Sequence, residues 1–385
     1  MDRRTFIKGC AAGALYGWSG AGLSALAGEY DLVMRRAGRG FPSPTDRAPG
    51  TYSFLMLGDM HYDKLPYTTY HSTILADHPE RMDYFNGTGY GENWAPGGRM
   101  ERLLAAARAA RRDDTAFALQ LGDLSQGYRS TLTMDDEAFA TVKSALGDDL
   151  PLRLVAGNHE CINATTYCYP PLQPADYRAW LAARMTEETG ASVSSSNFWY
   201  RQGPDLWIHC DFTASDATIL ANVNGAFAAN PDARYSFVVT HGPVIPTDSK
   251  WYYQPLCMGS AANRRTLRAT LLAHEAIVFA GHIHWTELEE CVTDDGRITQ
   301  IVASSVFGGE NQATYAPKWS DPSKFGVNST DAERLAVLNE YKPALVRYVY
   351  SNMAGFFRVE VSPQGVVARL FPGSATTPAA SWIVR

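Results

Sequence analysis

Five apolar, β-rich runs of this chain end in the same way, and this recurrence constrains the fold more than any other feature. The runs end at Leu57, Leu121, Ala156, Val239 and Ala280, and the segments that follow read GDMH, GD, GNHE, THGP and GHIH. Ligands of α/β sheets bind beyond the carboxyl ends of the strands. We therefore expect one cleft to collect eight polar side chains from these ends: Asp59, His61, Asp123, Asn158, His159, His241, His282 and His284.

The rest of the chain supports an α/β fold. Strand-forming runs alternate with segments of helical spacing, which predict helices over residues 99–112, 135–146, 175–188 and 263–274. Strands dominate from residue 287 onward, and Ser362-Pro363-Gln364-Gly365 predicts a hairpin turn. This order predicts helices that cover a sheet, in a single domain over residues 51–385.

The chemistry of the eight side chains favours metal binding. Imidazole nitrogens and carboxylate oxygens suit zinc, manganese and iron, and the set contains no soft thiolate. The set is too large for one tetrahedral ion but suits two ions that share a carboxylate, the usual arrangement for displacement at phosphorus. Taken singly, His61, His282 and His284 are also compatible with ordinary loop residues, and Asp123 with a turn or helix cap. Their joint occurrence at strand ends favours the metal site.

The ordered series D-x-H, GD, GNHE, H and GHxH, from Asp59 to His284, resembles the calcineurin-like metallophosphoesterase family. The resemblance implies a four-layer α-β-β-α sandwich with the metal site at the carboxyl ends of the strands. It also implies that one metal is held by Asp59, His61 and His284, that the other is held by Asn158, His241 and His282, and that Asp123 bridges both. His159 is implied to lie beside the scissile phosphate as general acid, and not to be a ligand.

The same resemblance implies a metal-dependent phosphoric ester hydrolase, a phosphatase or phosphodiesterase. Its cofactor is expected to be two divalent or trivalent ions (Mn, Fe or Zn), with in-line attack by a hydroxide that bridges them. The expected substrate is a small phosphomonoester or phosphodiester. The alternative is a non-catalytic metal-binding or scaffold protein on the same fold. Purple acid phosphatases use a tyrosine ligand where this chain has the D-x-H pattern, so we do not expect the chain to belong to that subgroup.

Three aromatic-rich insertions, residues 62–98, 161–197 and 244–260, are expected around the cleft. Aromatic side chains there either contact an organic part of the substrate or only pack the loops. Trp251, Tyr252 and Tyr253 are the substrate-binding candidates because they follow His241 closely. Glu160, directly after His159, either positions its neighbour or is solvated. Cys161 and Cys168 share one loop, and either a disulfide or two free thiols is compatible with the sequence.

Residues 1–27 have the layout of a signal peptide: a basic start, a weakly apolar stretch, and a small-x-small ending at Ala25-Leu26-Ala27. Arg3-Arg4 followed by Thr5-Phe6-Ile7-Lys8 resembles the twin-arginine export signal. This predicts a transient partner, the twin-arginine export machinery, and a bacterial periplasmic or extracellular location. Residues 28–50 form a polar lead-in.

Charge and hydropathy give no reason to expect a nucleic-acid partner, an anionic membrane surface or a membrane span. The formal net charge is -6, which disfavours binding to a nucleic-acid duplex or an anionic membrane surface. No segment after the predicted signal approaches the ~18 consecutive apolar residues of a membrane-spanning helix. We therefore expect no stable membrane span after processing.

Overall fold

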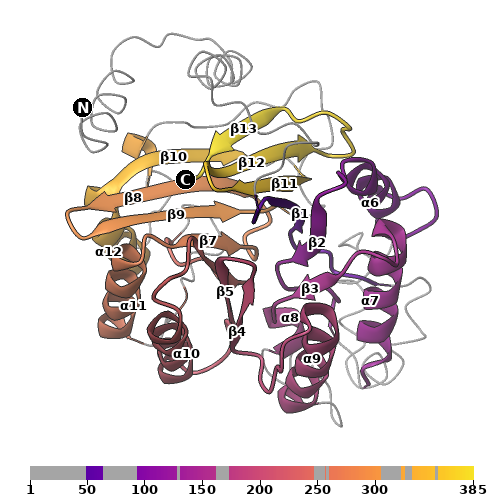
Figure 1. Ribbon diagram of the computed structural model, residues 1–385, viewed down its shortest axis with the longest axis horizontal. Helices are drawn as coiled ribbons and strands as arrows, with labels where there is room; N and C mark the ends of the chain where they lie inside the picture. Colours follow the sequence, from indigo (N-terminus) through magenta and orange to yellow (C-terminus); the bar gives the residue numbers. More distant parts are fainter. Residues whose placement is uncertain are drawn as a thin grey trace. The chain divides into compact units, whose positions relative to one another are not determined.

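The strands of the computed structural model form two mixed sheets (Figure 1). The structure describes residues 49–63, 93–127, 131–161, 173–246, 256, 260–304, 322–325, 332–351 and 354–385. All of them belong to the unit formed by residues 41–385. The predicted signal, the lead-in up to residue 48, and parts of all three insertions lie outside the described residues.

The first sheet has six strands in the order β13-β12-β11-β1-β2-β3. Strands β1, β2 and β3 are parallel, and β11, β12 and β13 extend the sheet in antiparallel fashion. The predicted hairpin turn is confirmed, since Ser362 pairs with Gly365. The strands are β1 (Tyr52–Leu57), β2 (Thr115–Gln120), β3 (Leu152–Leu154), β11 (Gly355–Ser362), β12 (Gly365–Pro372) and β13 (Ala380–Ile383).

The second sheet has seven strands in the order β10-β8-β9-β7-β6-β5-β4. Its centre, formed by β5, β6, β7 and β9, is parallel, and the other three strands are antiparallel to their neighbours. The strands are β4 (Phe198–Gln202), β5 (Asp205–Cys210), β6 (Ser236–Thr240), β7 (Ile277–Ala280), β8 (Thr286–Thr293), β9 (Gly296–Val302) and β10 (Leu345–Ser351).

The inner faces of the two sheets pack against each other through aromatic side chains. The ring of Phe54 on β1 lies 5.1 Å from Trp207 on β5 and 5.5 Å from Phe279 on β7. Phe117 on β2 also meets Trp207 edge-on at 5.1 Å. These residues are fully buried, so they remove a large apolar area from water and fix the two sheets face to face.

Helices cover the outer faces, which completes the predicted α-β-β-α sandwich (Figure 1). Helices α6 (Arg99–Ala109), α7 (Thr133–Leu146), α8 (Asn158–Cys161) and α9 (Pro174–Thr189) lie on the side of the six-stranded sheet. Helices α10 (Asp216–Ala229), α11 (Ala261–Ala273) and α12 (Ala332–Tyr341) lie on the side of the seven-stranded sheet. Two short 3₁₀ helices, Pro322–Lys324 and Lys342–Ala344, complete the elements. None of the described helices is long and apolar enough to cross a membrane.

The four helices predicted from the sequence are all present, with ends within three residues of those expected. Local signals explain the ends of α9: Gln173 and Asp176 form a reciprocal capping box, Pro174 opens the helix, and Gly190 ends it in left-handed conformation. Helices α8, α10 and α12 were not expected, and among the strands after residue 287, β10 and β13 were not predicted individually. The start of α10 carries a signal that could have found it, because the Ser215 side chain accepts a hydrogen bond from the Thr218 backbone.

Candidate metal centre

The eight side chains expected in one cleft lie on the loops that follow β1, β2, β6 and β7 and in the short helix α8, which follows β3. The donor atoms of six of them, Asp59, His61, Asp123, His241, His282 and His284, come close together in two groups that share Asp123. All but His284 are buried, and the side chain of His284 is 18% exposed. The parallel strands therefore bring residues from 59 to 284 to one edge of the sandwich, as the strand ends predicted.

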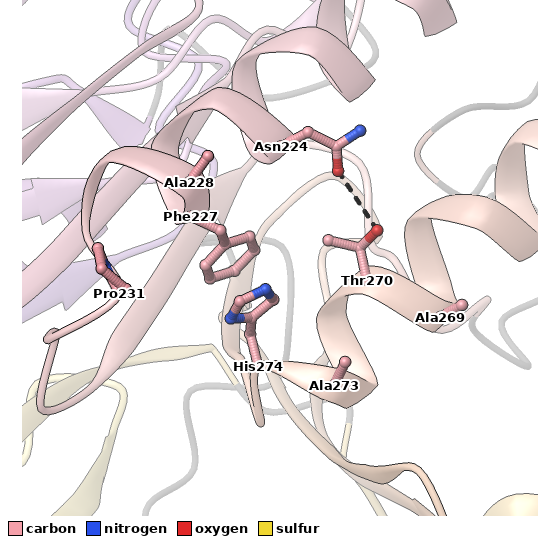
Figure 2. Close-up of a pocket in the computed structure, with 8 residues that line it drawn as sticks. All are labelled: Asn224, Phe227, Ala228, Pro231, Ala269, Thr270, Ala273 and His274. Atoms are coloured by element: carbon pink, nitrogen blue, oxygen red, sulfur yellow. Dashed lines mark hydrogen bonds between the residues drawn. The ribbon is translucent and has the colours of Figure 1, made fainter.

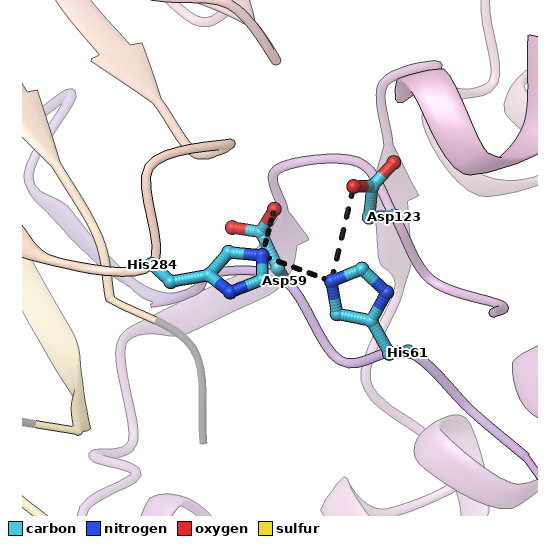
Figure 3. A group of neighbouring side chains, drawn as sticks. All are labelled: Asp59, His61, Asp123 and His284. Carbon is cyan, nitrogen blue, oxygen red and sulfur yellow. Dashed lines mark hydrogen bonds and ion pairs between the residues drawn. The ribbon is translucent and has the colours of Figure 1, made fainter. Parts of the chain in front are cut away.

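The first group contains Asp59, His61, Asp123 and His284 (Figure 3). One ligand atom from each lies within 4.8 Å of the others. His61 Nε2 is 3.0 Å from His284 Nε2 and 3.8 Å from an Asp123 carboxylate oxygen. His284 Nε2 is 3.6 Å from Asp59. Two nitrogens and two carboxylates thus point into one small space.

The second group contains Asp123, His241 and His282. His241 Nε2 lies 3.2 Å from Asp123 Oδ2 and 3.1 Å from His282 Nδ1. Asn158 also belongs here by position, since its Oδ1 is 3.0 Å from His241 Nε2. The Nδ1–H of His241 donates to the Leu121 carbonyl at 2.7 Å, which turns Nε2 toward the shared carboxylate.

The backbone is strained where these side chains converge. Among the described residues, five non-glycine residues have positive φ, and four are His61 (45°), Asp123 (52°), His282 (73°) and His284 (56°). This left-handed region is costly for residues with a Cβ atom, and such conformations cluster at functional sites. The loops therefore adopt unfavourable turns that aim their side chains inward.

Burial sets the protonation of the imidazoles. Burial lowers the pKa of His61 and His282 well below 6.5, and lowers that of His284 to about 3. These rings are therefore neutral at pH 7, the form that binds metal ions.

The carboxylates of Asp59 and Asp123 at the centre of the site stabilise positive charge near them. Burial by itself would lower the pKa of His241, but Asp123 and Asp59 outweigh it and raise the pKa to about 10. Burial likewise opposes ionisation of Asp123, yet His241 and His159 hold its pKa well below 3.8. Burial, with Asp123 adding to it, raises the pKa of Asp59 to about 7. Nitrogen and oxygen donors around a shared, ionised carboxylate fit divalent ions.

His159 lies beside the two groups without belonging to either. Its Nδ1–H donates to the Gln126 carbonyl at 2.7 Å, and its Nε2 is 3.9 Å from Asp123 Oδ2. Its backbone N–H donates to Asp123 Oδ1 at 2.9 Å. The ring of His159 therefore faces the site from a position beside both groups.

Other predicted residues lie outside the described part of the chain. These are Trp251, Tyr252, Tyr253 and Cys168, and of Cys161 only the backbone is described. One aromatic neighbour of the site was missed: Phe212, whose ring lies 5.2 Å from His282 and 6.0 Å from His241. The signal was present, because β5 ends at Cys210 and is followed by Asp211-Phe212, a sixth strand end of the same kind.

A separate hollow of about 650 Å³ lies between helices α10 and α11 (Figure 2). Phe227 and His274 stack within it, with ring centroids 3.8 Å apart. His274 directly follows α11, as its sequence position suggested. None of the eight residues that line the hollow is a predicted site residue.

The comparisons with known proteins agree with this geometry. The family model of calcineurin-like phosphoesterases matches residues 52–286. No curated protein matches the chain. The fold resembles a purple acid phosphatase from yellow lupin (Lupinus luteus) seeds, at 12% identity and a TM-score of 0.50. This likeness covers 89% of the present chain but only 55% of the lupin chain.

Two further structures are similar to this chain. GAP50, the anchor in the inner membrane complex of Plasmodium, has 12% identity and a TM-score of 0.50, with 87% of this chain and 89% of GAP50 covered. PhoD has 13% identity and a TM-score of 0.46, and the likeness covers 89% of this chain and 70% of PhoD. At these identities the likenesses to the lupin enzyme and GAP50 show a shared fold alone.

Proposed function

The chain belongs to the calcineurin-like phosphoesterase family, and on that premise we propose that it hydrolyses a small phosphomonoester or phosphodiester with two metal ions. One observation carries the proposal: two groups of potential ligands share the buried carboxylate of Asp123, with His159 beside them. Paired metals that share a ligand are the usual means of displacement at phosphorus.

The residues have separate roles in this proposal. Asp59, His61 and His284 would hold one ion, Asn158, His241 and His282 would hold the other, and Asp123 would belong to both. Ions bound there would supply Lewis acidity and lower the pKa of a coordinated water. Mn, Fe and Zn all suit this set of nitrogen and oxygen donors.

His159 would donate a proton to the leaving-group oxygen. The Gln126 carbonyl accepts from Nδ1–H and so holds the ring with Nε2 on the side of Asp123. Nε2 is therefore the atom that would carry the proton. A positioned general acid of this kind contributes typically 10²–10⁴-fold to the rate.

We also propose that the protein is exported before it acts. The twin-arginine-like segment at Arg3-Arg4 supports passage through the twin-arginine machinery to the periplasm or the exterior of a bacterial cell. That route transports folded proteins and is therefore compatible with ions loaded in the cytoplasm.

A non-catalytic role on the same fold is the alternative, and GAP50 is described as an anchor. A protein that had lost catalysis would be expected to have lost ligands. In this chain all seven proposed ligand positions and His159 keep residues suited to the chemistry.

The test compares hydrolysis of p-nitrophenyl phosphate and bis-p-nitrophenyl phosphate by the manganese-loaded mature protein. Asp123→Ala is the blank, because it removes the carboxylate that both groups share. We expect turnover of at least one substrate by the native protein and none by the variant, and the preferred substrate distinguishes monoesterase from diesterase.

Metal analysis accompanies the assay. Two ions per chain are expected, and one ion per chain would contradict the dinuclear site. Two bound ions without turnover of either substrate or of a panel of natural phosphoesters would favour the non-catalytic alternative.

A further inference from the structure

The carboxylate of Glu160 is completely buried next to the metal centre, although it belongs to neither ligand group. It accepts three backbone hydrogen bonds. Oε2 accepts from the N–H groups of Asp123 (3.1 Å) and Gly157 (3.0 Å), and Oε1 accepts from Ser125 N–H (3.1 Å). A solvated Glu160, one of the two alternatives left by the sequence, is therefore excluded.

These three donors come from two different loops. Asp123 and Ser125 follow β2, whereas Gly157 follows β3 and leads into Asn158 and His159. One side chain thus ties the loop of the shared carboxylate to the loop that carries a proposed ligand and the proposed acid. Charge-assisted bonds to backbone N–H groups are among the stronger hydrogen bonds in proteins.

A second bond crosses the same junction in the opposite direction. The Asp123 carboxylate accepts from the backbone N–H of His159, while the Glu160 carboxylate accepts from the backbone N–H of Asp123. Each loop therefore holds the backbone of the other through a buried carboxylate. The positive φ of Asp123 (52°) lies at this junction, where hydrogen bonds keep the backbone in an unfavourable conformation.

Gly157 allows the loops to approach this closely. A Cβ atom at position 157 would lie 2.2 Å from both the backbone N and Oδ1 of Asp123, and 2.8 Å from Glu160 Oε2. Such contacts are too short for any other residue, so the junction depends on the glycine as well as on the glutamate.

We propose that Glu160 is a positioning residue that fixes Asp123 relative to Asn158 and His159. This inference rests on the proposed function, because the groups that it positions are the proposed ligands and acid. Glu160 acts through the two loop backbones, without contact to substrate. Residues that orient metal ligands typically contribute 10–100-fold to metal affinity or activity.

The test is Glu160→Gln in the full chain. Glutamine keeps the size of the side chain but retains one acceptor oxygen and turns an NH₂ donor toward a backbone N–H. Glu188→Gln is the matched control, because the Glu188 side chain is only 7% exposed, its carboxylate also accepts from a backbone N–H, that of Leu152 at 2.8 Å, and it contacts Lys143. Unfolding curves of both variants show whether each one folds.

The first measurement is a Mn²⁺ titration by calorimetry, which does not depend on turnover. We expect Glu160→Gln to bind Mn²⁺ about 10–100-fold more weakly, as for other residues that orient ligands, and Glu188→Gln to bind like the native chain. Equal affinities of the two variants would overturn the proposal. If Glu160→Gln does not fold, Glu160→Asp replaces it, since the shorter side chain keeps the charge but cannot span both loops.

The second measurement compares kcat for p-nitrophenyl phosphate and phenyl phosphate at saturating Mn²⁺. A displaced His159 affects the poorer leaving group more, so phenyl phosphate turnover should fall further in Glu160→Gln. Loss of folded protein would instead reduce kcat for the two esters by the same factor. An equal reduction would therefore contradict the proposal that Glu160 positions His159. If the native chain binds Mn²⁺ but hydrolyses neither these monoesters nor bis-p-nitrophenyl phosphate nor the panel of natural phosphoesters, the proposed function fails, while the titration still decides the role of Glu160.

Discussion

At the scale of single residues, a backbone carbonyl decides which nitrogen of His159 serves the site. Because Gln126 O accepts from Nδ1–H, Nε2 is left on the side of Asp123. His159→Ala should therefore keep both metals and lose about 10²–10⁴-fold in kcat, the range for a general acid. Metal analysis and steady-state kinetics on the same preparation measure the two effects.

The matched control is His274→Ala, which removes an exposed histidine at the end of α11. It should change neither metal content nor kcat. If His159→Ala lost its metals as completely as Asp123→Ala, the division between ligands and acid would be wrong.

His209 gives a pH prediction that does not involve the metal centre. Its ring is fully buried, stacks on Phe198 at 4.4 Å and donates from Nδ1 to the Leu154 carbonyl. Burial lowers its pKa from 6.5 to about 3, so below pH 6.5 the unfolded chain binds a proton that the folded protein does not. The stability due to neutral His209 is complete above pH 6.5 and is lost as the pH falls toward 3.

Between pH 6.5 and about 3, the free energy of unfolding should fall by on the order of 1 kcal/mol per pH unit because of His209. Denaturant unfolding of the native chain and of His209→Gln, which keeps a donor for Leu154, measures it. The free energy of unfolding should fall more steeply with acid in the native chain. Parallel curves would show that His209 titrates equally in both states.

At the scale of elements, the turn after β2 depends on Gly122, because a side chain at this position would have no space. Gly122 has a φ of +90°, and a Cβ there would lie 2.5 Å from His241 Nδ1. Gly122→Ala should therefore displace His241 and weaken one metal site more than the other. A Mn²⁺ titration should change from two tight sites to one tight and one weak site.

Gly190→Ala is the control for backbone strain. Gly190 also has positive φ (69°), but a Cβ there meets nothing within 4 Å. Both variants should lose about 1 kcal/mol of stability from the left-handed conformation, and only Gly122→Ala should change metal binding. If Gly190→Ala weakened metal binding equally, strain and not contact with His241 would explain the effect.

Helices α9 and α10 differ in how well the sequence predicts them. Helix α9 was predictable because its capping box, its N-terminal proline and its C-terminal glycine are local. Helix α10 was missed, since its sequence DATILANVNGAFAA contains glycine and asparagine, and other apolar residues around the helix obscure the buried stripe. Packing of Ile219, Val223 and Phe227 beneath the seven-stranded sheet stabilises it despite this weak propensity.

At the scale of the whole molecule, the candidate metal centre joins the two sheets. Asp59, Asp123 and Asn158 follow strands of the six-stranded sheet, whereas His241, His282 and His284 follow strands of the seven-stranded sheet. Ions held by both sets would bind only the folded protein. Mn²⁺ at about 100 times its Kd should therefore add about 2.7 kcal/mol to the free energy of unfolding for one site.

Thermal unfolding with Mn²⁺ and after treatment with a chelator tests this linkage. The native chain should melt at a higher temperature with Mn²⁺, and Asp123→Ala should melt at the same temperature under both conditions. An equal rise in both proteins would mean that Mn²⁺ binds elsewhere.

The sequence by itself determined the α/β class, four helices, the hairpin at residues 362–365 and the family, because these depend on signals that are local or recur in order along the chain. It also named the eight residues that converge, since the carboxyl ends of parallel strands meet at one edge. Their roles as ligands and acid, and the export signal, stay predictions.

Only the tertiary structure decided how these residues are held. The hydrogen bonds that Glu160 accepts from the backbone of Asp123 and Ser125 span 37 and 35 residues. A side chain that bonds to backbone N–H groups leaves no pattern in the sequence, because any residue except proline supplies the donor. Such contacts become visible only when the fold brings the loops together.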